Sequence, residues 1–226
     1  SCREKRAWFP RLRRGKSPNM QAGAGKGAAL PVSAALEAGF GAAPEICEKP
    51  IRLASEAGLV GGSIEDATGD PATPIYELSH AIERVQAAAE AARYCPFLLT
   101  ARAENFLCGR RDLDDTIRRL QAFSAAGADV LYAPGLPDLE TIRTVCAAVD
   151  KPVNVVMGMP GATFGLAELA AAGVKRVSIG SAFARLAYGS FVAAAREAKA
   201  HGTFRFAEHA MGFAELEGFF TGETTA

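Results

Sequence analysis

Charged side chains follow two apolar segments of this chain at the points where those segments end. One segment runs into Glu65 and Asp66, and the next runs into Arg102 and then Glu104. In a parallel barrel, chemistry is placed at the carboxyl ends of the strands. Charges that directly follow buried residues are costly unless they have a function or a partner. The pattern therefore predicts an oxygen-rich pocket, able to hold a metal ion, with an arginine opposite it.

A third acid, Glu37, ends the preceding segment. Carboxylates from neighbouring strand ends are the hard oxygen ligands that Mg²⁺ prefers, with water completing its shell. The same acids are equally consistent with helix caps or with arginine pairs, and spacing alone leaves both interpretations open. Gly39 and Gly41 would let the backbone approach a ligand closely, although a Gly-x-Gly pattern is weak evidence.

Arg102 could hold a carboxylate or a phosphonate in a bidentate fork. The alternative is a structural ion pair with Glu65 or Glu104, and the sequence does not choose between them. Asn154 could hydrogen-bond a ligand, as could Ser178 and Ser181, although each of these types is more often structural.

No nucleophile with a neighbouring base is evident. The three histidines, at positions 80, 201 and 209, all fall in helical segments, and Cys108 has no histidine near it in the sequence. A thiol without such a base is more often unreactive. The sequence therefore predicts neither a histidine acid–base group nor a serine triad.

Short apolar strands alternate with helices from about residue 30 onward. We expect strands at 30–35, 59–64, 97–101, 130–133, 153–157 and 176–179, and helices near 44–57, 75–93, 113–126, 138–149 and 164–172. Asp112 and Asp138 precede two of the helices and place an acid at the positive helix end. Three of the helices end in Ala-Gly, at Gly58, Gly127 and Gly173, where glycine suits a left-handed cap before the next strand. This repeated unit predicts a parallel sheet.

Six strands of barrel type are recognisable, where a complete barrel has eight. Residues 1–29 are rich in Arg, Gly and Pro and have no strand pattern. We expect this basic segment to be disordered or non-native to the fold, and residues 30–226 to form an incomplete α/β barrel of the TIM type. Helices expected at 181–200 and 204–220 make a C-terminal tail that packs on the barrel or on another subunit.

Charge and composition exclude several classes of protein. Eight of the 25 basic residues but only one of the 25 acids lie in residues 1–26, so the rest of the 226-residue chain is acidic. An acidic body argues against nucleic acid as the main partner. No apolar run is long enough for a membrane span, and the N-terminus lacks the apolar core of a secretory signal. Five scattered cysteines fit a reducing cytoplasm.

The strand-end motifs together resemble those of the isocitrate lyase/phosphoenolpyruvate mutase superfamily. They are residues 35–41, 62–66, 100–104, 127–135 and 151–155, which occur in the family's order, and the resemblance covers about residues 30–220. It implies a (β/α)8 barrel whose last helix is often exchanged between subunits in a homo-oligomer. It also implies Mg²⁺ and an α-keto acid or phosphonate substrate, with a C–C or C–P bond formed or broken next to the carbonyl through an enolate.

Carried over by motif, Glu37 and Glu65 are the expected metal-shell acids. Arg102 and Glu104 are the expected catalytic residues. Substrate binding is expected at Arg102 and at three further positions, which are Gly39, Gly41 and Asn154. Together, the metal and the arginine would stabilise the negative charge that grows in the transition state.

This chain departs from the family pattern in three ways. Ala35 stands where the family normally has an aspartate that binds the metal directly. The Lys-Cys-Gly-His type of loop of the isocitrate-type lyases is absent after Asp66, which favours the mutase, phosphonate hydrolase and decarboxylase side. The pattern of the first two strands is missing.

Three functional hypotheses follow. The leading one is Mg²⁺-dependent lyase or mutase chemistry on a small α-keto acid. The second is a catalytically impaired barrel remnant that acts only by association through its C-terminal helices. The third is a metal-independent phosphate-binding barrel, which rests on the segment 178–181 at the start of a helix.

Overall fold

The computed structural model describes residues 30–161 and 163–221. Its contacts divide the chain after Ile179 into two compact units, and each is described by itself below. The expectation for residues 1–29 lies outside the described residues.

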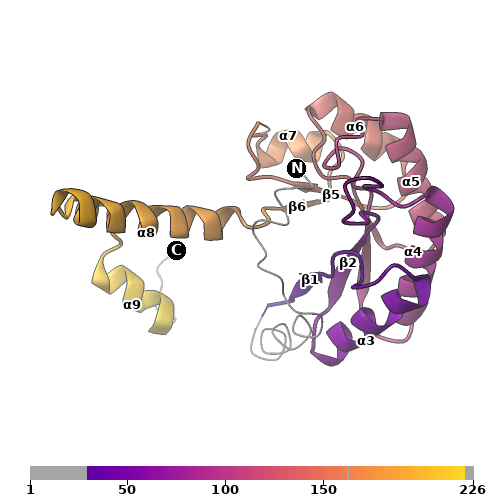
Figure 1. Cartoon of the computed structure of the whole chain (residues 1–226), viewed down its shortest axis with the longest axis horizontal. Helices are drawn as coiled ribbons and strands as arrows, with labels where there is room; N and C mark the ends of the chain where they lie inside the picture. The colour runs from indigo at the N-terminus through magenta and orange to yellow at the C-terminus, as the bar shows by residue number, and fades with distance from the viewer. Residues whose placement is uncertain (1–29, 162, 222–226) are drawn as a thin grey trace. The chain divides into compact units, whose positions relative to one another are not determined.

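The first unit contains a parallel six-stranded sheet whose strands follow one another in chain order. The strands are β1 (Ser33–Ala35), β2 (Gly61–Glu65), β3 (Leu98–Arg102), β4 (Val130–Tyr132), β5 (Val153–Val156) and β6 (Arg176–Ser178). The sheet curls into part of a barrel, with β1 at one edge and β6 at the other (Figure 1). The predicted incomplete α/β barrel of six parallel strands is confirmed.

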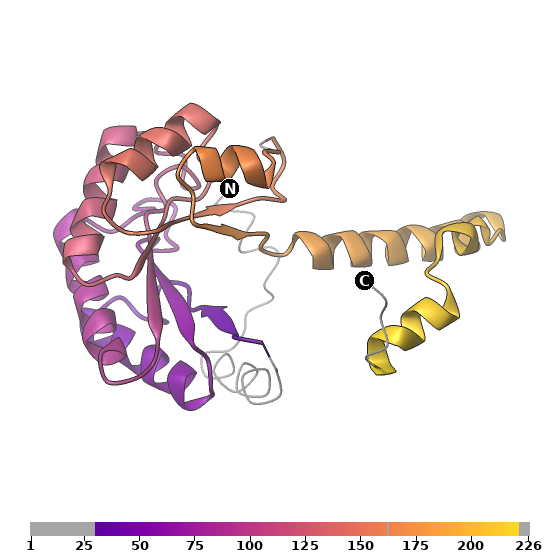
Figure 2. The same cartoon turned by 180° about the vertical axis from the view of Figure 1, so that it is seen from behind.

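Helices cover the outer face of this curled sheet, and each connects one strand to the next (Figure 2). They are η1 (Pro44–Cys47), α3 (Glu48–Glu56), α4 (Leu78–Ala92), α5 (Leu113–Ala125), α6 (Leu139–Ala148) and α7 (Leu166–Ala171). The single helix expected at 44–57 is therefore a short 3-10 turn followed by an α-helix.

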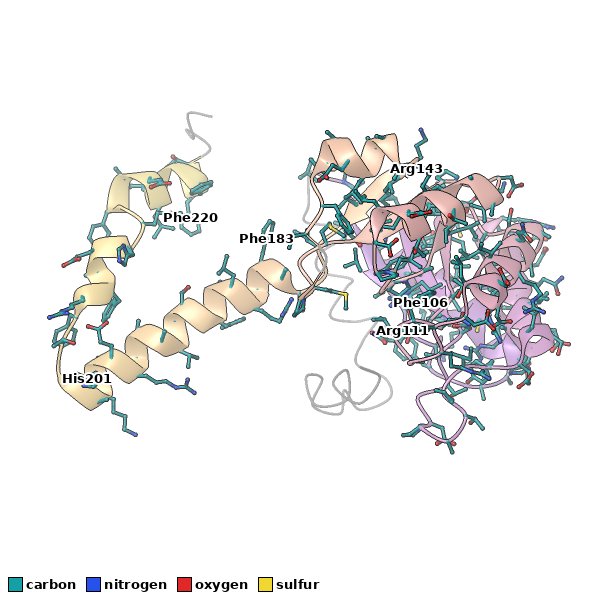
Figure 3. The ribbon with its side chains drawn as sticks, turned by 90° about the horizontal axis from the view of Figure 1, so that it is seen from above. Phe106, Arg111, Arg143, Phe183, His201 and Phe220 are labelled. Carbon is teal, nitrogen blue, oxygen red and sulfur yellow. The ribbon has the colours of Figure 1, made fainter. Side chains whose placement is uncertain are left out.

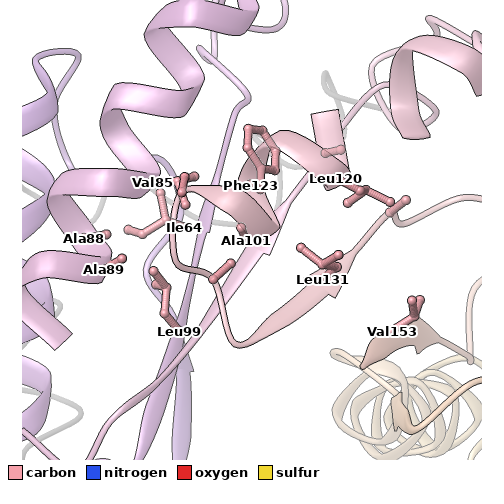
Figure 4. Close-up of a cluster of buried hydrophobic side chains, with 14 of the residues drawn as sticks. Ile64, Val85, Ala88, Ala89, Leu99, Ala101, Leu120, Phe123, Leu131 and Val153 are labelled. Atoms are coloured by element: carbon pink, nitrogen blue, oxygen red, sulfur yellow. The ribbon is translucent and has the colours of Figure 1, made fainter. Parts of the chain in front are cut away.

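The register of the sheet places one row of apolar side chains against the helices. Ile64 pairs with Ala101, Ala101 with Leu131, and Leu131 with Val153. These residues are buried together with side chains of α4 and α5 such as Val85, Ala88, Leu120 and Phe123 (Figure 4). Because side chains alternate along a strand, the residues next to this row point to the opposite, inner face.

Helix ends follow the local signals expected from the sequence. The side chain of Asp112 accepts a hydrogen bond from Asp115 N at 2.9 Å, and that of Asp138 accepts one from Thr141 N at 2.8 Å. Both carboxylates thereby satisfy amides at the positive end of a helix. After α5, Gly127 has a φ of 106°, the left-handed conformation predicted for the glycines that end these helices.

A side chain joins the two edge strands of the sheet. Arg176 on β6 donates from Nη2 to the Ser33 hydroxyl on β1 at 3.1 Å, although 143 residues separate them. The first residues of β1 and β6 therefore lie close together, so the sheet curls far enough to bring its edges within reach of one side chain.

The second unit consists of helices with many exposed apolar side chains. It contains α8 (Ala182–His201), the 3-10 turn η2 (Arg205–His209) and α9 (Phe213–Thr221). Phe183 on α8 and Phe220 on α9 are 70% and 84% exposed, and both are labelled in Figure 3. The segment expected as one amphipathic element at 204–220 is thus a turn and a helix. Among the described residues, no helix combines the length and the apolar content that a membrane crossing needs.

Candidate functional site

A row of polar residues lies on the inner face of the sheet, where β2 to β5 pair. Glu65 pairs with Arg102, Arg102 with Tyr132, and Tyr132 with Asn154. Each of these residues is adjacent in sequence to a member of the buried apolar row, so each points away from the helices. The alternation of side chains along the strands thus brings a carboxylate, a guanidinium, a phenol and an amide into one line.

Arg102 is the centre of this row. Its Nε donates to Glu104 Oε1 at 2.8 Å, and its Nη2 lies 3.3 Å from Glu65 Oε2. The guanidinium carbon stands 4.8 Å from the centroid of the Tyr132 ring, a cation–π distance. The ion pair that the sequence left open is therefore present, and it involves both candidate acids.

The charge of Arg102 is fixed by these neighbours. Burial by itself lowers the pKa of Arg102, but the negative charges of Glu104 and Glu65 outweigh burial and raise the pKa above its ordinary value. The guanidinium therefore stays cationic at any physiological pH. Among the described residues, the hydrogen bonds and ion pairs of Arg102 are made through Nε and Nη2, which leaves Nη1 for a ligand oxygen.

Asp66 lies behind the row and is 3% exposed. Its Oδ1 accepts a hydrogen bond from the backbone amide of Glu104 at 2.8 Å, and its Oδ2 lies 3.1 Å from Arg119 Nη1. Burial raises the pKa of Asp66 to about 6, although the amide of Glu104 and the charge of Arg119 oppose this rise. Asp66 therefore fixes the backbone that carries Glu104 rather than facing the row itself.

Glu37 lies at the end of β1 beside the β2 end. Its carbonyl accepts a hydrogen bond from the amide of Glu65 at 3.0 Å, and its side chain is exposed. Its φ of 53° is left-handed, which is uncommon for a non-glycine residue. The structure thus brings the backbones of the two predicted metal-shell acids together.

Packing accounts for the two glycines predicted to contact substrate. A Cβ at Gly39 would lie 2.9 Å from the Cys47 sulfur, and a Cβ at Gly41 would lie 2.7 Å from a methyl group of Ile46. Gly39 also has a φ of 66°. Gly39 therefore requires glycine for the close approach of η1, whereas at Gly41 an added Cβ would make the Ile46 side chain shift. Both effects are independent of any ligand.

Asn154 has one satisfied and one unsatisfied polar atom. Its Nδ2 donates to the Ser178 hydroxyl at 3.1 Å, whereas its Oδ1 is buried without a hydrogen-bond partner in the structure. Unpaired buried acceptors are rare and costly. The free Oδ1 makes Asn154 a good candidate to accept a hydrogen bond from a ligand.

The acidic side chains near the row fall short of what Mg²⁺ requires. In the described ranges 30–161 and 163–221, no three His, Cys, Asp or Glu side chains come together as a metal-binding group. Glu65 is already paired with Arg102, and Ala35 contributes only a methyl group at the last position of β1. The described residues therefore do not make a complete magnesium site.

Three residues around the site were not predicted, and they are Tyr132, Arg84 and Arg119. Tyr132 is the last residue of β4, a position that could have identified it. Each arginine lies on the buried face of its helix, as the buried residues beside it show: Ala81, Val85 and Ala88 on α4, and Thr116, Leu120 and Phe123 on α5. A charge at a position that the 3.6-residue period assigns to the core was the available signal.

A family model and the curated relatives of this chain point to the same family. The family model described as phosphoenolpyruvate phosphomutase matches residues 19–199. A protein named oxaloacetate decarboxylase from Bradyrhizobium diazoefficiens is 29% identical over 140 residues, which cover 60% of this chain and 47% of that protein. The 2-methylisocitrate lyase of Escherichia coli is 29% identical over 140 residues, covering 59% and 47%. The chain thus spans about half the length of these curated relatives.

A solved structure has a higher sequence identity to this chain than these two relatives have. A Burkholderia cenocepacia J2315 protein described as a lyase/mutase is 54% identical, with a TM-score of 0.88 over 92% of this chain and 76% of its own. The family model covers well over half of this chain, so the resemblance seen in the strand-end motifs is confirmed. The chain belongs to the phosphoenolpyruvate phosphomutase family, within the superfamily that also contains the isocitrate lyase type of enzymes.

Proposed function

We propose that this chain binds a small α-keto acid and makes or breaks the bond next to its carbonyl through an enolate. The observation that carries the proposal is Arg102, a buried cation that two glutamates hold through Nε and Nη2. A fixed guanidinium of this kind suits a carboxylate or an enolate oxygen. The names of the curated relatives, oxaloacetate decarboxylase and 2-methylisocitrate lyase, support this substrate class.

Decarboxylation of oxaloacetate illustrates the chemistry. The C–C bond to the departing carboxylate breaks, and its electron pair forms the C=C bond of an enolate while CO₂ leaves. The negative charge appears on the former carbonyl oxygen, and a proton from water then converts the enolate into pyruvate. Arg102 would contribute most where that charge develops, because a preorganised donor in a site shielded from water stabilises the transition state more than the ground state.

Each neighbour of Arg102 has a separate role in this proposal. Glu65 and Glu104 hold the guanidinium plane in place, and Tyr132 covers one face of it. Asn154, at the other end of the row, would accept a hydrogen bond from the substrate at its free Oδ1. Glu104 is proposed as the second catalytic residue, since it lies between Arg102 and the backbone that Asp66 fixes.

Magnesium dependence is a further part of the proposal. Glu37 and Glu65 would hold the ion, and the incomplete donor set among the described residues implies low affinity. The phosphate-binding hypothesis at 178–181 receives no support from the comparisons, and the barrel remnant becomes one outcome of the test below.

Calorimetric titration with oxalate, an enolpyruvate mimic, tests this site with and without Mg²⁺. We expect oxalate to bind and Arg102→Ala to lose about 10- to 100-fold in affinity, because a charge-assisted hydrogen bond is removed. Arg102→Lys keeps the charge and tests the fork itself. Arg93→Ala is the matched control, since Arg93 is an exposed arginine paired with Glu90 at 2.8 Å.

Two results would contradict the proposal. The first is the absence of heat from a folded sample at millimolar oxalate and Mg²⁺, which would favour the impaired remnant. The second is equal binding by wild type and both Arg102 variants, which would place the ligand elsewhere. Pyruvate release from oxaloacetate, followed with a coupled assay, then decides whether a chain that binds oxalate also turns over.

We also propose a homo-oligomer that forms through the C-terminal helices, in a cytoplasmic protein. Phe183, Leu186 and Phe191 on α8 are large apolar residues, and each is at least 68% exposed. Such helices are normally covered. Light scattering should give a mass above that of one chain, and Phe183→Glu should reduce it. A monomeric wild type would refute this part of the proposal.

A further inference from the structure

A buried guanidinium lies on α4, outside the row of candidate site residues. Arg84 is 1% exposed, and its side chain is the largest of the fully buried ones among the described residues. In the described part of the chain, no acidic side chain forms an ion pair with it. Burying an unpaired cation is expensive, so its position requires compensation of another kind.

Three backbone carbonyls of one loop supply that compensation. Arg84 Nη1 donates to Gly41 O at 2.8 Å and to Ala42 O at 2.5 Å, and Nη2 donates to Ala38 O. The Tyr76 ring lies 4.5 Å from the guanidinium carbon. A single planar fork thus spans both ends of a five-residue stretch, which one lysine ammonium could not do with the same geometry.

This stretch has an unusual backbone. Glu37, Gly39 and Phe40 have φ values of 53°, 66° and 67°, and Glu37 and Phe40 are the non-glycine residues with positive φ among those described. Left-handed conformations of ordinary residues cost free energy and persist only where the surroundings hold them. The carbonyls bound by Arg84 belong to residues that flank Gly39 and Phe40.

The same loop is attached to the candidate site. Leu36 N donates to Ser63 O and Glu65 N donates to Glu37 O, both at 3.0 Å, so the loop backbone continues the pairing of β1 with β2. His80 on α4 adds a contact between its Nε2 and Ala42 O at 2.8 Å. The loop is thus hydrogen-bonded to side chains of α4 and to the backbone of the strand end that carries Glu65.

We propose that Arg84 is a positioning residue that holds the loop of residues 36–42 in its left-handed conformation and so places Glu37 beside the end of β2. It acts through the backbone and touches no reacting group. The proposal rests on the proposed function only where it treats Glu37 and Glu65 as site residues, because the grip of Arg84 on the loop is independent of any substrate.

Hydrogen exchange of Arg84→Lys and Arg84→Met tests the grip without substrate. We expect the amides of residues 36–42 to exchange about tenfold faster than in wild type, the effect of losing about one hydrogen bond, while the amides of β4 and α5 keep their rates. Arg93→Met, on the exposed side of the end of α4, should change neither. If Arg84→Met fails to fold, Arg84→Lys carries the test.

Two exchange results would overturn the proposal. One is a loop that keeps wild-type protection in Arg84→Lys, and the other is acceleration spread evenly over all elements, as expected for a merely structural residue. The activity readout is separate: in Arg84→Lys, kcat for oxaloacetate decarboxylation should fall about tenfold while KM changes less than about twofold. An inactive wild type refutes the proposed function and leaves the exchange result to decide the role of Arg84. An active wild type with an unchanged variant refutes positioning.

Discussion

Asp66 and Arg119 form an ion pair at 3.1 Å that joins the end of β2 to α5 across 53 residues of sequence. Both are almost fully buried, and the second oxygen of Asp66 holds the amide of Glu104. Arg119 also donates to Asp115 Oδ2 at 2.8 Å and to Tyr76 O at 2.9 Å. The pair therefore ties together the backbone segments on which the candidate site is built.

Removal of Arg119 should destabilise the fold severely. Arg119→Met leaves the Asp66 carboxylate buried without its cation, so we expect a loss of about 3–5 kcal/mol in the free energy of unfolding. Arg118→Met is the matched control on the same helix, because Arg118 is mostly exposed and pairs with Asp115 at the surface. Its loss should be at most about 1 kcal/mol. Urea unfolding of the two variants checks the difference, and equal midpoints would show that the buried pair contributes nothing special.

Substitution of two glycines with similar backbone conformations should distinguish the cost of backbone strain from the cost of a steric clash. Gly39 and Gly109 both have positive φ, but a Cβ would touch the Cys47 sulfur at 2.9 Å in the first and nothing within 4 Å in the second. Gly109→Ala should cost about 1–2 kcal/mol from the left-handed conformation alone. Gly39→Ala should cost about 1–3 kcal/mol more, because the packed core resists an added methyl group. Equal losses in thermal unfolding would mean that η1 moves away freely.

The fold was predictable because its signals are local. Strand and helix periodicity, the glycines after the helices and the aspartate caps at 112 and 138 each depend on residues within one turn of each other. The division of 44–57 into η1 and α3 was not predicted, because the period of the sequence is continuous across it.

The site was predictable only where strand register determined it. Glu65 and Arg102 end adjacent parallel strands, so their proximity follows from alternation and order. Arg84 and Arg119 escaped prediction because all their hydrogen-bond partners except Asp115 lie 42 to 53 residues away in sequence. Whether Arg102 pairs with an acid or faces a ligand is decided by three-dimensional packing, which left both interpretations open at the level of sequence.

Truncation of Phe123 should destabilise the fold strongly, whereas truncation of Phe183 should change its stability little. Phe123 is fully buried between α5 and the sheet, so Phe123→Ala should cost about 3–5 kcal/mol by removing contacts and leaving a cavity. Phe183 on α8 is 70% exposed within this chain. Phe183→Ala should leave the stability of a dilute monomer within about 0.5 kcal/mol. A protein-concentration series of thermal melts checks this, because loss of an interface appears as a midpoint that no longer rises with concentration.

Asn154 should matter more for binding than for stability. Asn154→Leu removes an acceptor that has no partner and one hydrogen bond to Ser178, so the free energy of unfolding should change by no more than about 1 kcal/mol. Oxalate affinity should fall about tenfold if its Oδ1 faces the ligand. Asn105→Leu is the control, since Asn105 Oδ1 is also unpartnered but the residue lies outside the paired row. Equal effects of both variants on oxalate binding would remove Asn154 from the site.

Restoring a carboxylate at position 35 should create a metal-dependent ligand site. Ala35 is the exposed last residue of β1 and pairs with Ser63, two residues before Glu65, so a side chain there shares the inner face with Glu65. Ala35→Asp would add a third oxygen donor to Glu37 and Glu65, and we expect Mg²⁺ affinity to rise at least about tenfold in the presence of oxalate. Ala35→Asn, which has nearly the same shape without the charge, is the control. Calorimetry and the Mg²⁺ dependence of the melting temperature both report the gain, because an ion that binds only the folded state stabilises it. If the aspartate variant binds Mg²⁺ no better than the asparagine variant, the loss of one ligand does not explain the incomplete donor set, and the chain is better described as a barrel that has lost its metal chemistry.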